Sequence, residues 1–369
     1  MKPFDLIIGA ALGVGLAACA SVETQDDLAS VADTAPAELV EDSGLDIVVH
    51  EGDFAEIQQF TTPGGVSVWL VSEPSIPILS VAMAWEGGEA ADPEGLEGLA
   101  DAVVYHMNEG AGDLDSLAFQ TRMEDLNMSF GCSASSDWTS CSASMLTDNA
   151  DEAMSLVAQA FEAPRFDAGP FARFQREREV SLNTRETNAR YLAGRAEAQA
   201  IYPDHPYARE TSAESIAALT PELAKAHMRK LMVKDSLIVT AVGAITPEEL
   251  APMLDAIAES LPESNDLPET PEITFTVDGA FEPVLIDLPQ PQSLVRFLAP
   301  GLKREDPDFF TAYVVNYTYG GGGFGSRLME SLRVQKGLTY GVYTWLSFDD
   351  TYQNWGGSGQ TKNESVGEF

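Results

Sequence analysis

The chain has 369 residues, of which 44% are hydrophobic, so it can bury a sizeable core, and its length is typical of two domains. Acidic residues outnumber basic ones by 58 to 21, which gives a formal net charge of -37 and argues against nucleic acid as a ligand, because phosphates need basic partners. This charge would draw basic peptides towards a cleft, and solubility or a salty habitat explains it equally well.

The first 18 residues, MKPFDLIIGAALGVGLAA, pair a lysine with an apolar run that is too short to span a bilayer, which predicts a cleaved signal peptide. The run ends in Leu16-Ala17-Ala18-Cys19, which resembles the lipobox of bacterial lipoproteins, where the cysteine is lipidated. Acyl chains on Cys19 would anchor the protein to the membrane. We therefore expect a periplasm-facing lipoprotein of the bacterial cell envelope; an ordinary signal peptide with an incidental cysteine is the alternative.

Residues 19–45 are expected to form an acidic tether. Between Ala20 and Asp53 there are ten acidic residues and no lysine or arginine. Such a segment cannot bury enough apolar surface to fold by itself, so the first domain is predicted to begin at residue 46 and to extend to residue 261.

Within this first domain, hydrophobic patterning predicts strands and helices in alternation. Apolar residues alternate with others at 65–71 and 78–85, as in strands, and helical periodicity follows over 94–108 and 114–126. The remaining expected elements are a helix opened by a capping box at Asn149 and Glu152, a long charged helix at 170–201, helices from Thr211 and Thr220, a strand at 236–245 and a helix from Thr246.

Strands and helices mix without a regular βαβ rhythm, which predicts an α+β fold with helices on one face of a largely antiparallel sheet. Residues 262–272, rich in proline and acid, are predicted to link this domain to a second one at 273–369. MEDLNMSFG (123–131) and LRVQKGLTYG (332–341) are similar segments about 210 residues apart, which indicates a duplication. On that spacing the second copy stops little more than halfway, so we expect the second domain to be incomplete.

Two cysteines flank the turn of a predicted hairpin, MSFGCSASSDWTSCSASML. Cys132 and Cys141 are equidistant from its centre, so antiparallel pairing about that centre places them opposite each other, where a disulfide is possible. Two buried free thiols are the alternative, because a one-residue shift in register would separate the pair.

No constellation of metal ligands or nucleophiles is evident in the sequence. None of the four histidines pairs with another at helical spacing; His106 with Glu109 makes half a motif and is more simply explained as a helix-end histidine beside a solvated acid. The run GGGGFG (320–325) matches G-x-G-x-x-G but lacks the lysine and hydroxyl of a phosphate-binding loop. Four successive glycines predict a flexible loop that lets another backbone approach closely.

Longer segments resemble a known family. GGGGFGSRLMESLRVQKGLTYGVYTWLS resembles the second-domain signature of the insulinase/pitrilysin peptidases, which include the mitochondrial processing peptidase and its bacterial relatives. YPDHPYARETSAESIAALTPELAKAHMRK and LIVTAVGAITPEEL resemble the first domain of that family. The similarity covers residues 46–369 and implies two homologous α+β domains of the LuxS/MPP-like metallopeptidase fold.

The resemblance also implies that the zinc site is degenerate. Active members carry H-x-x-E-H on a helix and a further glutamate some eighty residues later. By register from GLA, Asp101 stands at the first histidine, Val104 at the catalytic glutamate and Tyr105 at the second histidine; Thr184 stands at the third ligand, with Glu186 close enough to be the alternative. Valine cannot take a proton from water, and without both imidazoles the site cannot hold zinc, so we expect no metal, no cofactor and no peptide hydrolysis in this chain alone.

The other half of the family's machinery is present. In heterodimeric relatives one subunit supplies zinc, and its partner supplies an arginine and a tyrosine from the glycine-loop domain that bind the substrate peptide. The matching residues are Arg333 and Tyr340, with Gly321, Gly322 and Gly323 of the loop. Without the resemblance, Arg333 would be read as a favourable charge near a helix C-terminus and Tyr340 as a half-buried strand aromatic.

These features predict a non-catalytic, substrate-binding subunit of a heterodimeric zinc peptidase, with zinc held by a homologous partner subunit and with peptide as the ligand. A purely structural subunit, kept for assembly, is the second hypothesis. An independent hydrolase with unrecognised ligands is the third.

Overall fold

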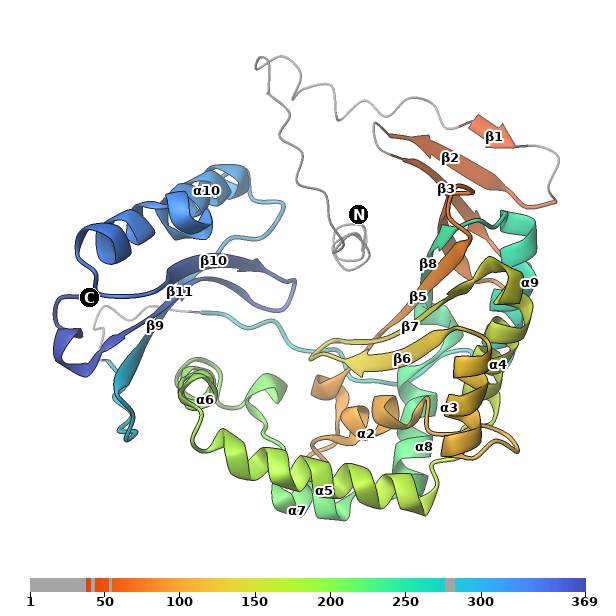
Figure 1. The fold of residues 1–369 in the computed structure, drawn as a ribbon, viewed down its shortest axis with the longest axis horizontal. Helices are drawn as coiled ribbons and strands as arrows, with labels where there is room; N and C mark the ends of the chain where they lie inside the picture. Colours follow the sequence, from red (N-terminus) through yellow and green to blue (C-terminus); the bar gives the residue numbers. More distant parts are fainter. Residues whose placement is uncertain (1–37, 41–43, 53–54, 276–282) are drawn as a thin grey trace. The chain divides into compact units, whose positions relative to one another are not determined.

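The computed structural model describes residues 38–40, 44–52, 55–275 and 283–369 (Figure 1). The predicted signal peptide, Cys19 and most of the predicted tether lie outside these residues. The chain divides into two compact units: the first extends to Glu177 and resumes over Thr211–Pro268, and the second comprises Arg178–Glu210 and Glu269–Phe369. The division after Pro268 falls within the segment predicted as a linker, 262–272.

The first unit is built on an eight-stranded sheet in the order β1-β2-β3-β4-β8-β5-β7-β6. All neighbouring strands are antiparallel except β4 and β8, which are parallel. The strands are β1 (Glu38–Val40), β2 (Ile47–Glu51), β3 (Glu56–Thr61), β4 (Ser67–Ser72), β5 (Ile78–Glu86), β6 (Ser129–Ala134), β7 (Trp138–Leu146) and β8 (Ile238–Gly243).

Helices cover one face of this sheet (Figure 1). In β5, Leu79, Val81, Met83 and Trp85 are buried and alternate with more exposed residues, as expected for a strand with one face on the core. The helices are α2 (Leu99–His106), α3 (Ser116–Asp125), α4 (Ala150–Glu162), α7 (Ala213–Ala218), α8 (Pro221–Leu231), α9 (Pro247–Ala258) and the first part of α5 (Ala168–Arg185). No helix in the described ranges is long and apolar enough to cross a bilayer.

The opposite face of the sheet, over β5, β7 and β6, carries small polar side chains. Serines on adjacent strands lie opposite one another there, with Oγ–Oγ distances of 3.1 Å between Ser80 and Ser144 and 3.0 Å between Ser133 and Ser140. Because the side chains of a strand alternate between faces, these serines project away from the helices.

Two predicted helices differ from those observed. The long helix expected at 170–201 is two helices, because Asn188 accepts hydrogen bonds from the Arg190 and Tyr191 amides and so begins α6 (Ala189–Ile201) after α5 has ended. The capping box expected at Asn149 is also wrong. The Asn149 amide instead donates to the Leu126 carbonyl over 2.8 Å.

The second unit repeats part of the first. It contains β9 (Gln292–Pro300), α10 (Phe309–Asn316), β10 (Val342–Phe348) and β11 (Gln353–Lys362), together with α6. Its sheet has the order β10-β11-β9, which matches β6-β7-β5 of the first unit, and in both units a helix follows the first of these strands. The repeated order supports the predicted duplication and confirms the α+β fold class with two domains. Arg296 of β9 binds Glu197 of α6 through two contacts of 2.8 Å.

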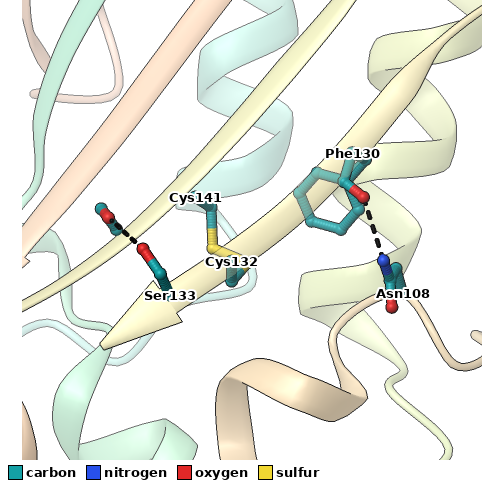
Figure 2. The surroundings of a disulfide bond; sticks show 6 residues. Asn108, Phe130, Cys132, Ser133 and Cys141 are labelled. Carbon is teal, nitrogen blue, oxygen red and sulfur yellow. Dashed lines mark hydrogen bonds between the residues drawn. A yellow bond between two sulfur atoms is a disulfide. The ribbon is translucent and has the colours of Figure 1, made fainter. Parts of the chain in front are cut away.

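The hairpin of β6 and β7 is joined by a disulfide between Cys132 and Cys141 (Figure 2). The two cysteines are direct partners in the strand register, on the face that carries buried residues such as Ala143. Figure 2 also shows the Asn108 amide donating to the Phe130 carbonyl of β6 over 3.1 Å. The strand is thus held on one side by β7 and at one point by the segment that follows α2.

Replacing both cysteines, Cys132→Ser with Cys141→Ser, is expected to lower the free energy of unfolding by about 2–3 kcal/mol, because the short closed loop no longer restricts the unfolded chain. The midpoint of chemical denaturation measures the loss. Wild-type protein kept reduced by thiol should lose the same amount, and an unchanged midpoint in both would show that the bond contributes nothing to stability.

Candidate functional site

The start of α2 is fixed by one buried carboxylate. Asp92 accepts hydrogen bonds from the amides of Gly98 and Leu99, each at 2.9 Å, and of Ala100, at 2.8 Å. Its Oδ1 also lies 3.2 Å from Nε2 of His227 on α8, and both side chains are buried. The first-turn amides of a helix lack helical partners, so this carboxylate satisfies three of them and ties α2 to α8.

The glycine before α2 is required by its geometry. Gly98 has φ of 97°, a conformation that residues with a side chain rarely adopt, and an added Cβ would lie 3.0 Å from Ile216 and 3.2 Å from Thr211. The GLA sequence therefore marks the point where α2 enters the packed core.

Three of the four predicted degenerate positions lie on α2. Val104 is buried, and Asp101 and Tyr105 are half-buried, one turn of α2 apart. Thr184 lies on α5 in the second unit, exposed, with its hydroxyl donating to the Ser181 carbonyl over 2.8 Å. Its alternative, Glu186, accepts from Arg195 at 3.0 Å. These contacts assign neither Thr184 nor Glu186 as a metal ligand.

Tyr105 belongs to a cluster that joins α2 to α5. Its hydroxyl donates to Glu177 over 3.0 Å and accepts from Nε of Arg173 over 3.1 Å. Nη2 of Arg173 also lies 2.6 Å from Glu109, whose same oxygen accepts the Ser116 hydroxyl at 2.5 Å. A guanidinium therefore occupies the neighbourhood where the resemblance would place a metal ion.

The electrostatics of the cluster keep Arg173 charged and Tyr105 neutral. Hydrogen bonds to Tyr105 and Glu109 raise the pKa of Arg173 above its usual range. Burial raises the pKa of Tyr105; the contact with Arg173 acts against this shift, and the contact with Glu177 adds to it. A neutral tyrosine beside a cation is a poor general base at neutral pH.

His106 points away from any open site. It is fully buried, its Nδ1 donates to the Ala102 carbonyl over 2.7 Å, and its ring stacks on Phe166 and Phe171. Burial lowers its pKa, so the neutral ring is favoured. Its role is in the core, which agrees with the simpler interpretation made from the sequence.

The glycine run is helical rather than a flexible loop. Tyr317–Gly321 forms a π-helical turn and Gly323–Gly325 a short 3-10 turn. A Cβ on Gly320 would lie 2.5 Å from Oγ1 of Thr344 on β10 and 3.0 Å from its backbone nitrogen. The predicted close approach therefore occurs within the chain itself, between this turn and β10, and the predicted flexibility is wrong.

The two residues matched to substrate binding lie just after this run. Arg333 is part of a helical segment, Met329–Gln335, and its guanidinium lies 4.5 Å above the ring of Phe324. Tyr340 is 85% exposed, in a turn where Thr339 bonds both the amide and the carbonyl of Gly341. Tyr340 is thus more exposed than the half-buried strand aromatic that local sequence suggests.

Within residues 38–40, 44–52, 55–275 and 283–369, no group of three or more histidine, cysteine, aspartate or glutamate side chains is arranged to hold a metal ion. Two family models match the chain: insulinase, peptidase family M16, over residues 67–213, and the peptidase M16 inactive domain over residues 218–369. The chain belongs to the M16 family.

Relatives agree with this assignment. A protein of Helicobacter pylori named as the non-peptidase homolog YmxG is 27% identical over 290 residues, which cover 78% of this chain and 66% of the relative. The chain thus spans just under two thirds of that protein's length.

Solved structures show the same architecture. The peptidase M16 inactive domain from Pseudomonas fluorescens superposes with a TM-score of 0.75 and 26% identity, covering 84% of this chain and 75% of that one. A protease from Helicobacter pylori, with a TM-score of 0.69 and 15% identity over 85% of this chain and 78% of that one, shares the M16 fold.

Sequence reasoning did not find several residues that shape the M16-like site. The roles of Arg173 and Asp92 depend on contacts with α2 that only the folded chain makes. Arg173 lies 68 residues after its partner Tyr105, and Asp92 lies in the loop before α2. The Asp92-Pro93 pair shortly before a helix was the one available signal, since an aspartate there commonly caps. The contact of Phe324 with Arg333 had no sequence signal.

Asp92→Ala is expected to lower the free energy of unfolding by about 3 kcal/mol, because three amides of α2 lose their acceptor in a buried place. Thermal or chemical unfolding measures this. Asp115 offers a matched control, since it caps α3 through one exposed bond to Ala118 and its loss should cost about 1 kcal/mol. Equal losses in the two variants would contradict the role given to Asp92.

His106 should make stability depend on pH. Its pKa is lowered in the folded protein by burial, against smaller raising effects of the Ala102 carbonyl and Glu109, while an unfolded histidine titrates near 6.5. As the pH falls below that value the unfolded state binds the proton first, so stability is lost by up to about 1.4 kcal/mol per pH unit. The gap in stability between wild type and His106→Gln, measured from pH 8 to pH 5, should shrink accordingly; a constant gap would rule this out.

Proposed function

We propose that this chain is a non-catalytic, substrate-binding subunit of a heterodimeric zinc peptidase, with zinc held by a homologous partner subunit. The proposal rests on the residues at two positions of α2. Val104 is a buried apolar residue at the position of the catalytic base, and Tyr105, at a ligand position, is held by Arg173 and Glu177. Neither group can activate water, so the hydrolytic centre would have to come from another chain.

The relatives support a role without catalysis. One is named a non-peptidase homolog, and the model matching residues 218–369 is described as an inactive domain. Inactivity of this chain agrees with its own substitutions at positions 101, 104 and 105.

Exposed groups in the second unit support a role in binding. Tyr340 is largely exposed, and Arg333 is half-buried, with its guanidinium stacked on the exposed ring of Phe324. An arginine fork and a phenol hydroxyl can both donate to peptide carbonyls. We propose that this pair is presented to a peptide at the partner's zinc centre.

The first unit adds a place for an extended peptide. β6 ends the strand order of its sheet, and α2 packs on it. The outer edge of such a strand offers backbone donors and acceptors, to which an extended segment can add as a further strand. This edge lies beside the degenerate helix, as a subunit that holds peptide rather than cuts it would need.

We further propose that the chain is exported and anchored through a lipid on Cys19, facing the periplasm. The support is the apolar run before Leu16-Ala17-Ala18-Cys19, together with the Cys132–Cys141 disulfide, a bond that persists in oxidising compartments.

Co-expression with an M16 relative that carries H-x-x-E-H tests the proposal. The complex should cleave peptide in a zinc-dependent way, and Arg333→Ala in this chain should lower turnover by about tenfold or more, as expected when a charged donor to the substrate is removed. Lys362→Ala, an exposed change at the end of β11, serves as the control. The chain purified alone should neither cleave peptide nor retain stoichiometric zinc.

Full turnover in the Arg333→Ala complex would remove the proposed role of this residue, and stoichiometric zinc in the isolated chain would overturn the proposal as a whole.

One observation favours a second candidate, a subunit kept for assembly. Phe310, Tyr313, Val314 and Tyr317 of α10 and the following turn have the i, i+3, i+4, i+7 spacing of one helical face, and all four are exposed. Their counterparts at the 210-residue spacing, in and just after α2, are buried. An apolar face of this kind is suited to burial by a neighbouring protein. A stable complex that forms without zinc and shows no peptidase activity would support this candidate.

A further inference from the structure

The ring of Phe324 lies against the guanidinium of Arg333 and is otherwise largely exposed to solvent. The guanidinium carbon lies 4.5 Å from the ring centroid, within the range of a cation–π contact. Phe324 is 71% exposed, although a phenylalanine needed for the core would be buried. It sits between Gly323 and Gly325 in a short turn, and Gly323 has φ of 64°.

Stacking leaves the hydrogen-bonding edge of Arg333 available. A ring under the flat face of a guanidinium contacts its carbon and nitrogens from below, while the N–H groups point outward in the plane. Among the described residues, no carboxylate lies within 4.0 Å of the Arg333 nitrogens. Its N–H groups are therefore not neutralised by an acid of the described chain, although the whole chain has a net charge of -37.

Two other arginines are paired with acids. Arg173 lies 2.6 Å from Glu109, and Arg296 holds Glu197 through two contacts of 2.8 Å. Their N–H groups are committed to the fold. Those of Arg333 are held in place by a ring and directed at no acid of the described chain, which is the arrangement expected of a residue that binds an external carboxylate bidentately.

We propose that Phe324 is a positioning residue that holds Arg333 as a receptor for a peptide carboxylate, so that the ligand is a peptide bearing an acidic side chain. This inference rests on the proposed peptide-binding function and deepens it, because it names the ligand class. The exposed ring of Tyr340 follows Arg333 in the same unit and offers apolar contact to the residues that flank the acid. Phe324 acts through Arg333.

The test uses two capped pentapeptides, acetyl-Ala-Leu-Glu-Leu-Ala-amide and its glutamine counterpart. They differ only in a side-chain carboxylate that is replaced by a carboxamide. Each is titrated into the isotopically labelled chain, and the Nε–H resonance of Arg333 is followed by NMR in 150 mM salt. The glutamate peptide should bind at least fivefold more tightly than the glutamine peptide, since a charge-assisted bidentate pair exceeds a neutral bond. Ring current from Phe324 should also displace the Arg333 signals in the free protein.

Variants separate positioning from folding. Arg333→Gln should abolish the preference for glutamate. Phe324→Leu should reduce it roughly twofold to fivefold, the worth of an exposed cation–π contact, and Phe324→Trp should restore it. Phe310→Leu is the matched control, because Phe310 is also an exposed ring, 5.0 Å from the guanidinium carbon of Arg304, and should leave the preference intact.

Equal affinity for the two peptides would overturn the assignment of a carboxylate ligand. An unchanged preference in Phe324→Leu would overturn the positioning role. The titration needs no partner subunit, so its outcome is independent of the co-expression test: a chain that prefers the glutamate peptide yet supports no zinc-dependent cleavage would retain this inference and lose the proposed function.

Discussion

The contact between Arg173 and Tyr105 is the constraint on which the interpretation of the first unit depends. Two hydrogen bonds connect α2 with α5, and an ion pair connects α5 with Glu109 just after α2, beside positions that the family resemblance matches to zinc ligands. The cation therefore keeps the two helices together, while the chemistry is absent because neither Val104 nor a neutral Tyr105 can accept a proton from water. Asp92 completes the arrangement by fixing the start of α2 from the other end.

The two units use one strand order in different ways. In the first, the helix after β5 is covered by α8 and its Tyr105 is bonded to Arg173. In the second, the helix after β9 continues into the glycine turn, which lies against Thr344 and leads to Arg333 and Tyr340. The first unit thus supplies a scaffold and the second supplies exposed donors. This division of roles is consistent with the proposed subunit that binds peptide without cleaving it.

The sequence was sufficient for whatever depends on local pattern. Alternation located β4, β5 and β8 within a few residues, and the helix expected from Thr246 formed; the structure adds a capping box, with Glu249 bonded to the Thr246 amide. The prediction of one long helix over 170–201 was wrong because the N-cap at Asn188 outweighed continuous helical propensity. The glycine run was wrong because close packing against β10 stabilised helical turns that isolated glycines disfavour. Arg173 and Phe324 were out of reach, because their partners are set by tertiary packing.

The serine face of the β5–β7–β6 sheet has a consequence for selectivity. Its central part carries short, uncharged side chains that pair across the strands, as between Ser80 and Ser144. Paired serines offer neither a charge nor a large apolar side chain with which to select one sequence over another. A main chain laid along it would be accepted largely regardless of the residues it carries, so the choice among peptides would fall to the few strongly polar groups elsewhere in the protein.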